Sequence, residues 1–225
     1  MKATRGTLTV ALLFILAIVF TGGNVLAAKP IVVGCPLSTA FLYGWDAERG
    51  VTLAIEEINA KGGVLGKQVE LLVEDDVCKP EVATNTATKL VSEGVHVVLG
   101  HICSGATKAA LGIYKDSNIP VMSPSATNPA LTQSGDYPNF FRTIAPDDAQ
   151  AEVDVDFVIN KLGFTKIAVI HDKGDYGKGF AEFAKKYIED SGKAEVVLFE
   201  GVTPGGVDYS AIVNKVKRSK AEVVM

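Results

Sequence analysis

Short apolar runs alternate with segments of helical periodicity from residue 31 to residue 225. The runs have the length of strands, and the segments between them place apolar residues on one face at the period of an amphipathic helix. Strands that alternate with helices in this way predict βαβ units and parallel sheets, so we expect an α/β fold. The predicted strands are 31–34, 68–74, 95–99, 121–122, 140–144, 167–170, 196–199 and 223–225.

The predicted helices each carry an apolar face that we expect to lie against a sheet. The first covers 45–61, and Gly62 and Gly63 end it because glycine accepts the left-handed conformation of a helix C-terminus. A second begins at Pro80, and Asp147 with Asp148 is expected to cap a later one. The expected inward residues are Val51, Ala54, Ile55, Ile58, Ala83, Ala87, Leu90, Val91, Ala106, Ala109, Ala110, Ile113, Val155, Val158, Ile159, Leu162, Phe180, Phe183, Ala184, Tyr187, Ile188, Ile212 and Val216.

Residues 123–146 break this rhythm, because they are rich in Pro, Ser, Asn and Thr and contain no long helical pattern. We interpret them as a loop region and a crossover, with a boundary near Ala145 and Pro146. The predicted organisation is therefore a first lobe in 28–145 and a second lobe in 146–225.

The N-terminal residues have the pattern of a secretory signal peptide over 1–27. Lys2 and Arg5 precede the apolar stretch VALLFILAIVF, and small residues around Ala27 offer a cleavage site. The apolar stretch is short for a membrane span, so an uncleaved anchor is the weaker alternative. We therefore expect export to the periplasm.

Export changes what the three cysteines can do, because disulfides persist outside the cytoplasm. Cys78 and Cys103 both lie just past the ends of predicted strands, on the same sheet edge, so we predict that they pair. Cys35 is then left over, as a buried free thiol or, less well supported, a lipoprotein cysteine. The net charge of −4 gives no support to nucleic-acid binding.

Small hydroxyl residues gather where predicted strands lead into the following segments. Ser104 and Gly105 open a helix after the run VHVVL, where we expect Ser104 to be the N-cap. Ligands of open α/β sheets bind at such carboxyl ends, and a helix N-terminus favours an anion. After the next strand, Ser125, Ala126 and Thr127 offer a carbonyl, a hydroxyl and N–H groups suited to an ammonium group and a carboxylate. Together they suit a zwitterion, although Ser and Thr often only cap helices and turns.

Other chemistry has less support. His101 and Cys103 are two residues apart, but no four-ligand metal set is visible, so we expect no metal and no cofactor. His171, Asp172 and Asp175 could carry out acid–base chemistry, but polar residues that line a cleft and cap a helix are the better interpretation. The sequence contains no GxSxG, Walker or GxGxxG motif.

The chain resembles the branched-chain amino-acid-binding proteins, the periplasmic leucine/isoleucine/valine receptors of ABC importers. The matching runs cover nearly all of the expected mature chain: YGWDAERGVTLAIEEINAKGG, VEDDVCKPEVA, VVLGHICSGATKAALGIY, SPSATNPALT, FFRTIAPDDAQ and IAVIHDKGDYGKG. The resemblance implies a type I periplasmic binding fold, with two Rossmann-like lobes that close over the ligand. It also implies that the family continues past residue 225, so the second lobe would be incomplete here.

The resemblance also implies roles for particular residues. Ser104 and its neighbouring N–H groups would hold the ligand α-carboxylate, and Ser125 and Thr127 would bind the α-ammonium and complete the carboxylate contact. Tyr43 would line the side-chain pocket, and Tyr176 would reach across from the second lobe. The family has a disulfide at the positions of Cys78 and Cys103, and a small residue where Cys35 stands.

The expected function is therefore capture of a branched-chain or aliphatic L-amino acid by a monomeric receptor and delivery to a membrane ABC permease. One alternative keeps the fold but binds an amide, urea or an aromatic acid. The least supported alternative is a secreted α/β hydrolase that uses Ser104 or His171, since no nucleophile–base–orienter set is visible.

Overall fold

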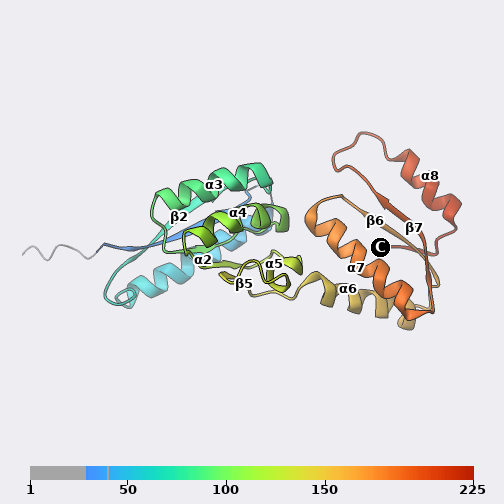
Figure 1. Cartoon of the computed structure of the whole chain (residues 1–225), viewed down its shortest axis with the longest axis horizontal. Helices are drawn as coiled ribbons and strands as arrows, with labels where there is room; N and C mark the ends of the chain where they lie inside the picture. The colour runs from blue at the N-terminus through green and yellow to red at the C-terminus, as the bar shows by residue number, and fades with distance from the viewer. Residues whose placement is uncertain (1–28, 40) are drawn as a thin grey trace, which may run out of the picture.

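The computed structural model describes residues 29–39 and 41–225 and shows two α/β lobes, each built around its own sheet (Figure 1). The expected signal peptide lies outside these residues. No helix in the described ranges combines the length and apolarity needed to cross a membrane. The first lobe contains β1 (Ile31–Leu37), α2 (Leu42–Ala60), β2 (Val69–Asp75), α3 (Pro80–Ser92), β3 (Val97–Leu99), α4 (Ser104–Asp116), β4 (Val121–Ser123), α5 (Ala130–Gln133) and β5 (Phe140–Arg142).

The second lobe follows with α6 (Asp147–Asp156), the π-helical turn η1 (Phe157–Lys161), β6 (Lys166–His171), α7 (Asp175–Ser191), β7 (Glu195–Gly201), α8 (Ser210–Ser219) and β8 (Val223–Val224). The sheet orders are β2-β1-β3-β4-β5 and β7-β6-β8, and every pairing between these strands is parallel. The predicted α/β class with parallel sheets is therefore confirmed. In each sheet the strand order reverses beside the first strand, at β1/β3 and at β6/β8, which is where open α/β sheets bind ligands.

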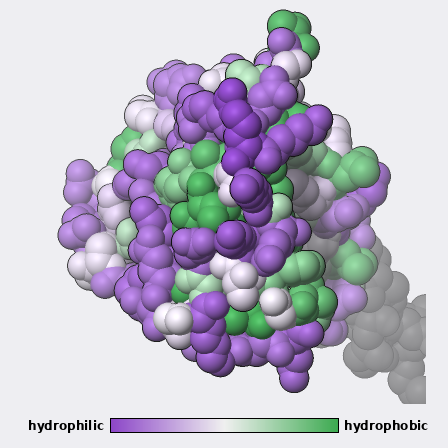
Figure 2. All heavy atoms as spheres, turned by 90° about the vertical axis from the view of Figure 1, so that its right-hand side faces the viewer, coloured by the Kyte–Doolittle hydropathy of each residue, from purple (hydrophilic) through white to green (hydrophobic). Residues whose placement is uncertain are grey.

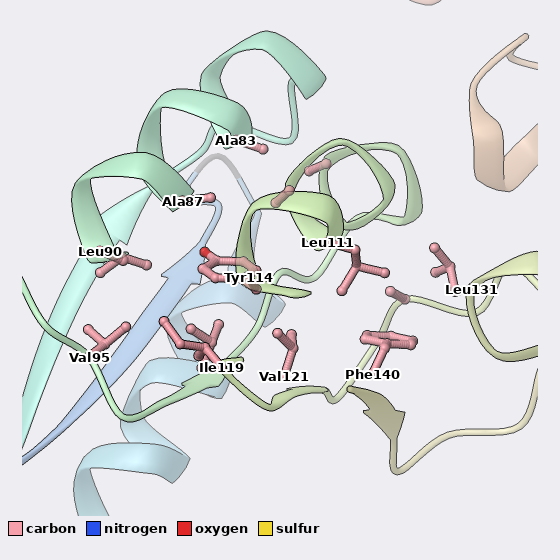
Figure 3. Packing of buried hydrophobic residues seen from close by; sticks show 14 residues of the cluster. Ala83, Ala87, Leu90, Val95, Leu111, Tyr114, Ile119, Val121, Leu131 and Phe140 are labelled. Atoms are coloured by element: carbon pink, nitrogen blue, oxygen red, sulfur yellow. The ribbon is translucent and has the colours of Figure 1, made fainter. Parts of the chain in front are cut away.

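The core of the first lobe lies between the sheet and the paired helices α3 and α4 (Figure 3). Leu90, Leu111 and Val121 are completely buried there, and Phe140 of β5 closes one end. The other face of β1 packs beneath α2, where Cys35 and Leu37 are buried. Burying one leucine side chain stabilises a fold by about 1.5–3 kcal/mol, so the α3/α4 layer is the main source of stability of this lobe.

Helix α2 differs from its expected role as a buried helix. Gly44 is its only buried residue among those described, and Leu53 is 58% exposed. Val51 reaches the small cluster of Cys35 and Leu37, whereas Ala54 and Ile58 are exposed. The periodicity correctly predicts a helix, but in the described part of the chain no element covers its outer apolar side.

The core of the second lobe lies between β6 and the helices α6 and α7. Ala184 and Ile188 are fully buried, as predicted, and Phe180, Phe183 and Tyr187 pack around them. No residue of α8 is buried. Hydrophobic side chains interrupt the otherwise mostly hydrophilic end face of this lobe (Figure 2).

Three expected strand boundaries were wrong, and hydrogen bonding explains the first two. Strand β1 continues to Leu37 because it is paired along its whole length with β2. Strand β3 begins only at Val97, because the N–H of Val95 bonds to the Leu90 carbonyl at the end of α3 instead of a strand. Strand β5 stops at Arg142, two residues before the predicted end.

The predicted inward position of Leu162 was also wrong, since this residue is 49% exposed. The π-helical turn at 157–161 precedes it and adds a residue to the turn. That addition rotates the following side chains away from the face that Val155 presents to the core. Asp147 and Asp148 lie in the first turn of α6, while Pro146 holds the N-cap position.

Candidate functional site

A cavity of about 1150 Å³ lies between the lobes at the carboxyl ends of their strands. Six of the residues expected at the ligand site line it: Tyr43, Ser104, Gly105, Ser125, Thr127 and Tyr176. Ala126 is fully buried beside them and does not line the cavity, so only its backbone is available. Ligand pockets are typically roughly 300–1,000 Å³, so the space is ample for a small solute.

Ser104 is the first helical residue of α4, and Cys103, not Ser104, holds the N-cap position. The correction matters for chemistry, because a capping hydroxyl would be bonded to its own helix. Instead the Ser104 Oγ accepts the backbone N–H of Asn128 at 3.2 Å. A serine hydroxyl can accept and donate together, so its proton remains available. With the N-terminal N–H groups of α4, this favours an anion such as a carboxylate.

The loop after β4 is held in place by Ser123, a residue that the sequence analysis did not single out. Its hydroxyl donates to the His101 carbonyl at 2.5 Å and accepts the N–H groups of Ser125 and Ala126 at 3.2 and 2.9 Å. The loop therefore presents Ser125 and Thr127 to the cavity in a fixed arrangement. The only signal in the sequence was a serine at a strand end, which is common in turns.

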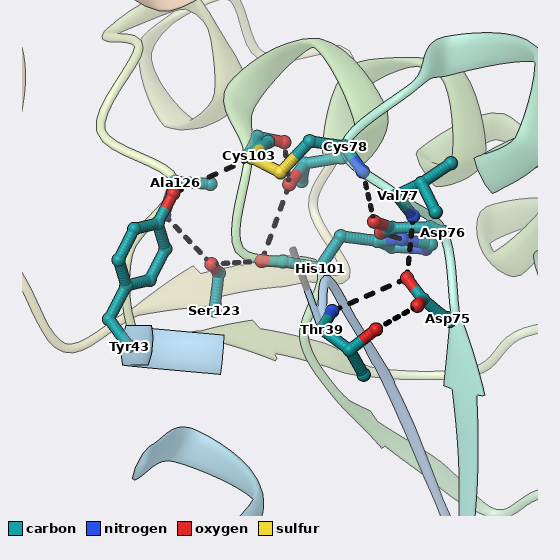
Figure 4. Close-up of a disulfide and its surroundings, with 11 residues drawn as sticks. Thr39, Tyr43, Asp75, Asp76, Val77, Cys78, His101, Cys103, Ser123 and Ala126 are labelled. Carbon is teal, nitrogen blue, oxygen red and sulfur yellow. Dashed lines mark hydrogen bonds and ion pairs between the residues drawn. A yellow bond between two sulfur atoms is a disulfide. The ribbon is translucent and has the colours of Figure 1, made fainter. Parts of the chain in front are cut away.

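The predicted disulfide between Cys78 and Cys103 is present, with the two Cα atoms 5.5 Å apart. It joins the end of β2 to the start of α4, as Figure 4 shows. The Tyr43 hydroxyl lies 4.0 Å from the Cys103 Sγ, and the Phe41 ring stacks on Tyr43 with centroids 5.2 Å apart. These two rings and the disulfide form an apolar wall beside the polar groups of α4. Cys35 is a buried free thiol.

A buried polar network lies behind the disulfide, around His101. Its Nδ1 is 2.5 Å from the Asp76 Oδ2, and its Nε2 is 3.1 Å from the Tyr114 hydroxyl. Asp76 also accepts the backbone N–H of Cys78 at 2.8 Å. All three side chains are completely buried, so the network stabilises the disulfide loop and the His101 carbonyl that orients Ser123. The sequence analysis considered His101 only as a metal ligand, and this network is the role that it missed.

The second lobe contributes a polar wall from the segment between β6 and α7. Asp172, Lys173 and Asp175 line the cavity beside Tyr176. Burial raises the pKa of Tyr43 and of Tyr176, with further contributions from Asp76 at Tyr43 and from Asp147 at Tyr176. Both phenols are therefore neutral and able to donate hydrogen bonds near neutral pH.

Asp147 is a further buried acid close to this site. Its side chain is 0% exposed, and in the described part of the chain neither carboxylate oxygen has a hydrogen-bond partner. Its backbone N–H bonds to the Thr127 carbonyl at 3.0 Å. Burial raises the pKa of Asp147, and the nearby Thr127 hydroxyl and, to a smaller extent, the Arg142 guanidinium oppose this. A buried carboxylate without a partner is costly and is a signature of functional sites.

The alternative chemistries find little support in this geometry. Within residues 29–39 and 41–225 no group of three or more His, Cys, Asp or Glu could hold a metal ion. His101 is engaged with Asp76 and Tyr114, and the His171 Nδ1 accepts the N–H of Lys173 at 3.0 Å. No histidine in the described ranges hydrogen-bonds to Ser104, so a nucleophile–base pair is not assembled.

Residues 33–225 match the family model described as "Periplasmic binding protein", and the chain belongs to this family. A leucine-, isoleucine-, valine-, threonine- and alanine-binding protein of Pseudomonas aeruginosa is 41% identical over 81% of this chain and 48% of its own length. The Leu/Ile/Val-binding protein of Escherichia coli K12 is 36% identical over 87% of this chain and 53% of its own length. The resemblance to branched-chain amino-acid-binding proteins is thus confirmed.

Solved structures agree in fold. The branched-chain amino acid transporter substrate-binding protein LivJ of Streptococcus pneumoniae, in complex with isoleucine, superposes with a TM-score of 0.75 and 33% identity. The match covers 87% of this chain and 56% of that one. A solute-binding protein of R. palustris in complex with benzoate has a TM-score of 0.73 and 26% identity, with coverage of 87% and 54%. The chain spans about half the length of the curated relatives that it matches.

Proposed function

We propose that this chain is part of an extracytoplasmic receptor that binds branched-chain or aliphatic L-amino acids by closure of its two lobes. The observation that carries the proposal is the cavity in which Ser104 and the α4 N-terminus face Ser125 and Thr127. Hydrogen-bond donors for a carboxylate lie beside acceptors for an ammonium group, so the polar part of the site suits the common portion of α-amino acids.

The side-chain end of the ligand is assigned to the apolar wall of Phe41, Tyr43 and the disulfide, with Tyr176 on the opposite lobe. Burial of a leucine or isoleucine side chain against such a wall contributes about 1.5–3 kcal/mol. The relatives whose names state leucine, isoleucine and valine as ligands support this assignment, as does the isoleucine complex of LivJ. The benzoate complex supports an aromatic acid as the second candidate, because it shares the fold and a carboxylate.

We further propose that residues 1–27 direct export to the periplasm, where the receptor works as a monomer and delivers its ligand to a membrane ABC permease. The pattern of the N-terminus and the periplasmic family support the location. The lobe boundary near Ala145 and Pro146 is part of the same proposal, since the chain passes there from β5 to α6.

The test is isothermal titration calorimetry of the mature chain with L-leucine, L-isoleucine, L-valine, D-leucine, benzoate and urea. We expect one-to-one binding of the L-amino acids and none of D-leucine, whose ammonium and side chain would exchange places. Ser104→Ala removes a hydrogen bond to a charged group and should weaken leucine binding about tenfold to a hundredfold. Ser117→Ala, at the exposed far end of the same helix, is the matched control.

Heat from benzoate or urea, with silence towards leucine, would retain the fold and replace the ligand. Leucine binding that is unchanged in Ser104→Ala would contradict the site. Turnover of a bound ester or amide would instead support the hydrolase alternative.

A further inference from the structure

Asn128 uses every one of its hydrogen-bonding groups, and the partners lie in four parts of the protein: α4, α5, β5 and the second lobe. Its backbone N–H donates to the Ser104 Oγ at 3.2 Å, and its carbonyl accepts from Arg142 at 2.9 Å and from the Leu131 N–H at 3.2 Å. Its side-chain Oδ1 accepts the N–H of Ala130 at 3.0 Å, at the start of α5. Its Nδ2 donates to the Asp175 carbonyl at 2.9 Å, in the second lobe. One residue therefore joins the candidate ligand serine, the adjoining loop and the opposite lobe.

The amide orientation of Asn128 follows from these partners. The Ala130 N–H requires an acceptor and the Asp175 carbonyl requires a donor, so only one assignment of oxygen and nitrogen satisfies both. Glycine allows the close approach of α7, because a Cβ at Gly179 would lie 3.0 Å from the Asn128 Nδ2. A Cβ at Gly105 would likewise lie 3.1 Å from the Asp175 carboxylate. The contact between the lobes is thus closely packed on both sides of Asn128.

A second contact between the lobes is the ion pair of Lys108 with Asp175, at 3.4 Å. Their side chains are 55% and 39% exposed, and exposed pairs of this kind contribute little. The Asn128 bond uses the backbone carbonyl of Asp175 and does not depend on that carboxylate. The two contacts can therefore be separated by mutation.

We propose that Asn128 is a positioning residue that couples occupation of the Ser104 site to closure of the lobes. The inference rests on the proposed function for its ligand. When the Ser104 Oγ accepts from the Asn128 N–H, its own O–H is polarised and donates more strongly to a carboxylate. The same residue holds the second lobe through Nδ2. A bound anion and a closed cleft therefore stabilise the same conformation of Asn128, and each favours the other.

The test uses Asn128→Asp, which retains the oxygen that accepts from Ala130 and replaces the donor to Asp175 with a repelling oxygen. Asn214→Asp, at an exposed position of α8, makes the same change of charge away from the cleft. Asp175→Asn removes only the exposed ion pair. Asn128→Ser is a second variant, because a serine hydroxyl can still accept the N–H of Ala130 but cannot reach the second lobe.

Leucine binding is measured by calorimetry and stopped flow, and separation of the lobes by small-angle X-ray scattering of the ligand-free chain. Loss of one hydrogen bond predicts a dissociation constant about two- to tenfold higher in Asn128→Asp and Asn128→Ser, mostly through faster dissociation. The radius of gyration should increase in both. Asn214→Asp should match the wild type, and Asp175→Asn should change less than either Asn128 variant.

Unchanged dissociation and an unchanged radius of gyration in both Asn128 variants would overturn the coupling role. Slower association with unchanged dissociation would also overturn the coupling role, since that pattern indicates a damaged binding site and not the loss of the contact between the lobes. If the wild type binds no leucine, the proposed ligand fails, and the scattering comparison still decides whether Asn128 holds the lobes together.

Discussion

Removal of the Cys78–Cys103 disulfide has a magnitude that can be worked out from its place in the chain. The two cysteines are separated by 25 residues, and the loop between them includes the whole of α3 and β3. In the chain-entropy model, closing a loop of this length restricts the unfolded chain and contributes about 3.5 kcal/mol to the free energy of unfolding. The double variant Cys78→Ser, Cys103→Ser should lose close to that amount.

The native structure should survive this change. The N–H of Cys78 is held by Asp76, and the N–H of Thr107 bonds to the Cys103 carbonyl at 2.9 Å, so both ends are anchored by other bonds. The buried cluster that contains Cys35 also packs around both ends. We therefore expect the loss of stability to come from the unfolded state, with the cavity and its ligand binding largely retained.

The assay is guanidinium-induced unfolding of oxidised protein and of the double variant, both in a Cys35→Ala background that prevents exchange with the third thiol. A difference below about 1 kcal/mol would refute the entropic argument, since it would mean that the unfolded chain is already restricted. Thiol titration of denatured wild-type protein without reductant should detect one thiol, and a count of three would refute the disulfide itself.

Three further predictions concern buried groups. Burial raises the pKa of Cys35 to about 12, so iodoacetamide at pH 8 should modify this thiol only after denaturation, and equal modification of native protein would contradict the burial. The free energy of unfolding should also fall as pH rises from the ordinary thiol pKa of 9.0 towards 12. Asp147→Asn should raise the free energy of unfolding at pH 7 by about 1 kcal/mol, with a smaller gain in acid, because the raised pKa of Asp147 means that its carboxyl stabilises the fold only when protonated. Denaturant melts at several pH values test this, and a loss of stability at pH 7 would refute it. Leu90→Ala should lower the free energy of unfolding by about 2–5 kcal/mol in denaturant-induced unfolding, whereas Leu53→Ala on the exposed side of α2 should lower it by less than about 0.5 kcal/mol. Similar losses in the two variants would mean that α2 is covered in solution.

Most of the fold was predictable because its signals are local. Each strand and each long helix of the first lobe was identified from its periodicity. Apart from the exposed outer side of α2, the errors lie at element ends such as Val95 and in the turn before Leu162. Those errors depend on which carbonyl a particular N–H finds and on one added residue in a helix. Neither is encoded in hydrophobic periodicity.

The candidate site was predictable in part. Strand ends that carry Ser104 and Thr127 identify the edge at which a ligand site forms, because parallel strands share their carboxyl edge. Tyr43 and Tyr176 came from family resemblance and not from any local pattern. Ser123, Asp147 and the His101 network went unrecognised, because their importance depends on partners between 13 and 25 residues away in the sequence.

By itself, the sequence determined the α/β class, the parallel sheets and the disulfide pair, since each follows from local periodicity or from strand order along the chain. Only the tertiary structure decided that Cys103 and not Ser104 holds the N-cap position of α4, that α2 keeps an exposed apolar side, and that Asn128 joins the two lobes. Those features arise where segments far apart in the sequence meet. A hydrogen bond such as that from Asn128 to Asp175 spans 47 residues, and no periodicity in either segment signals it.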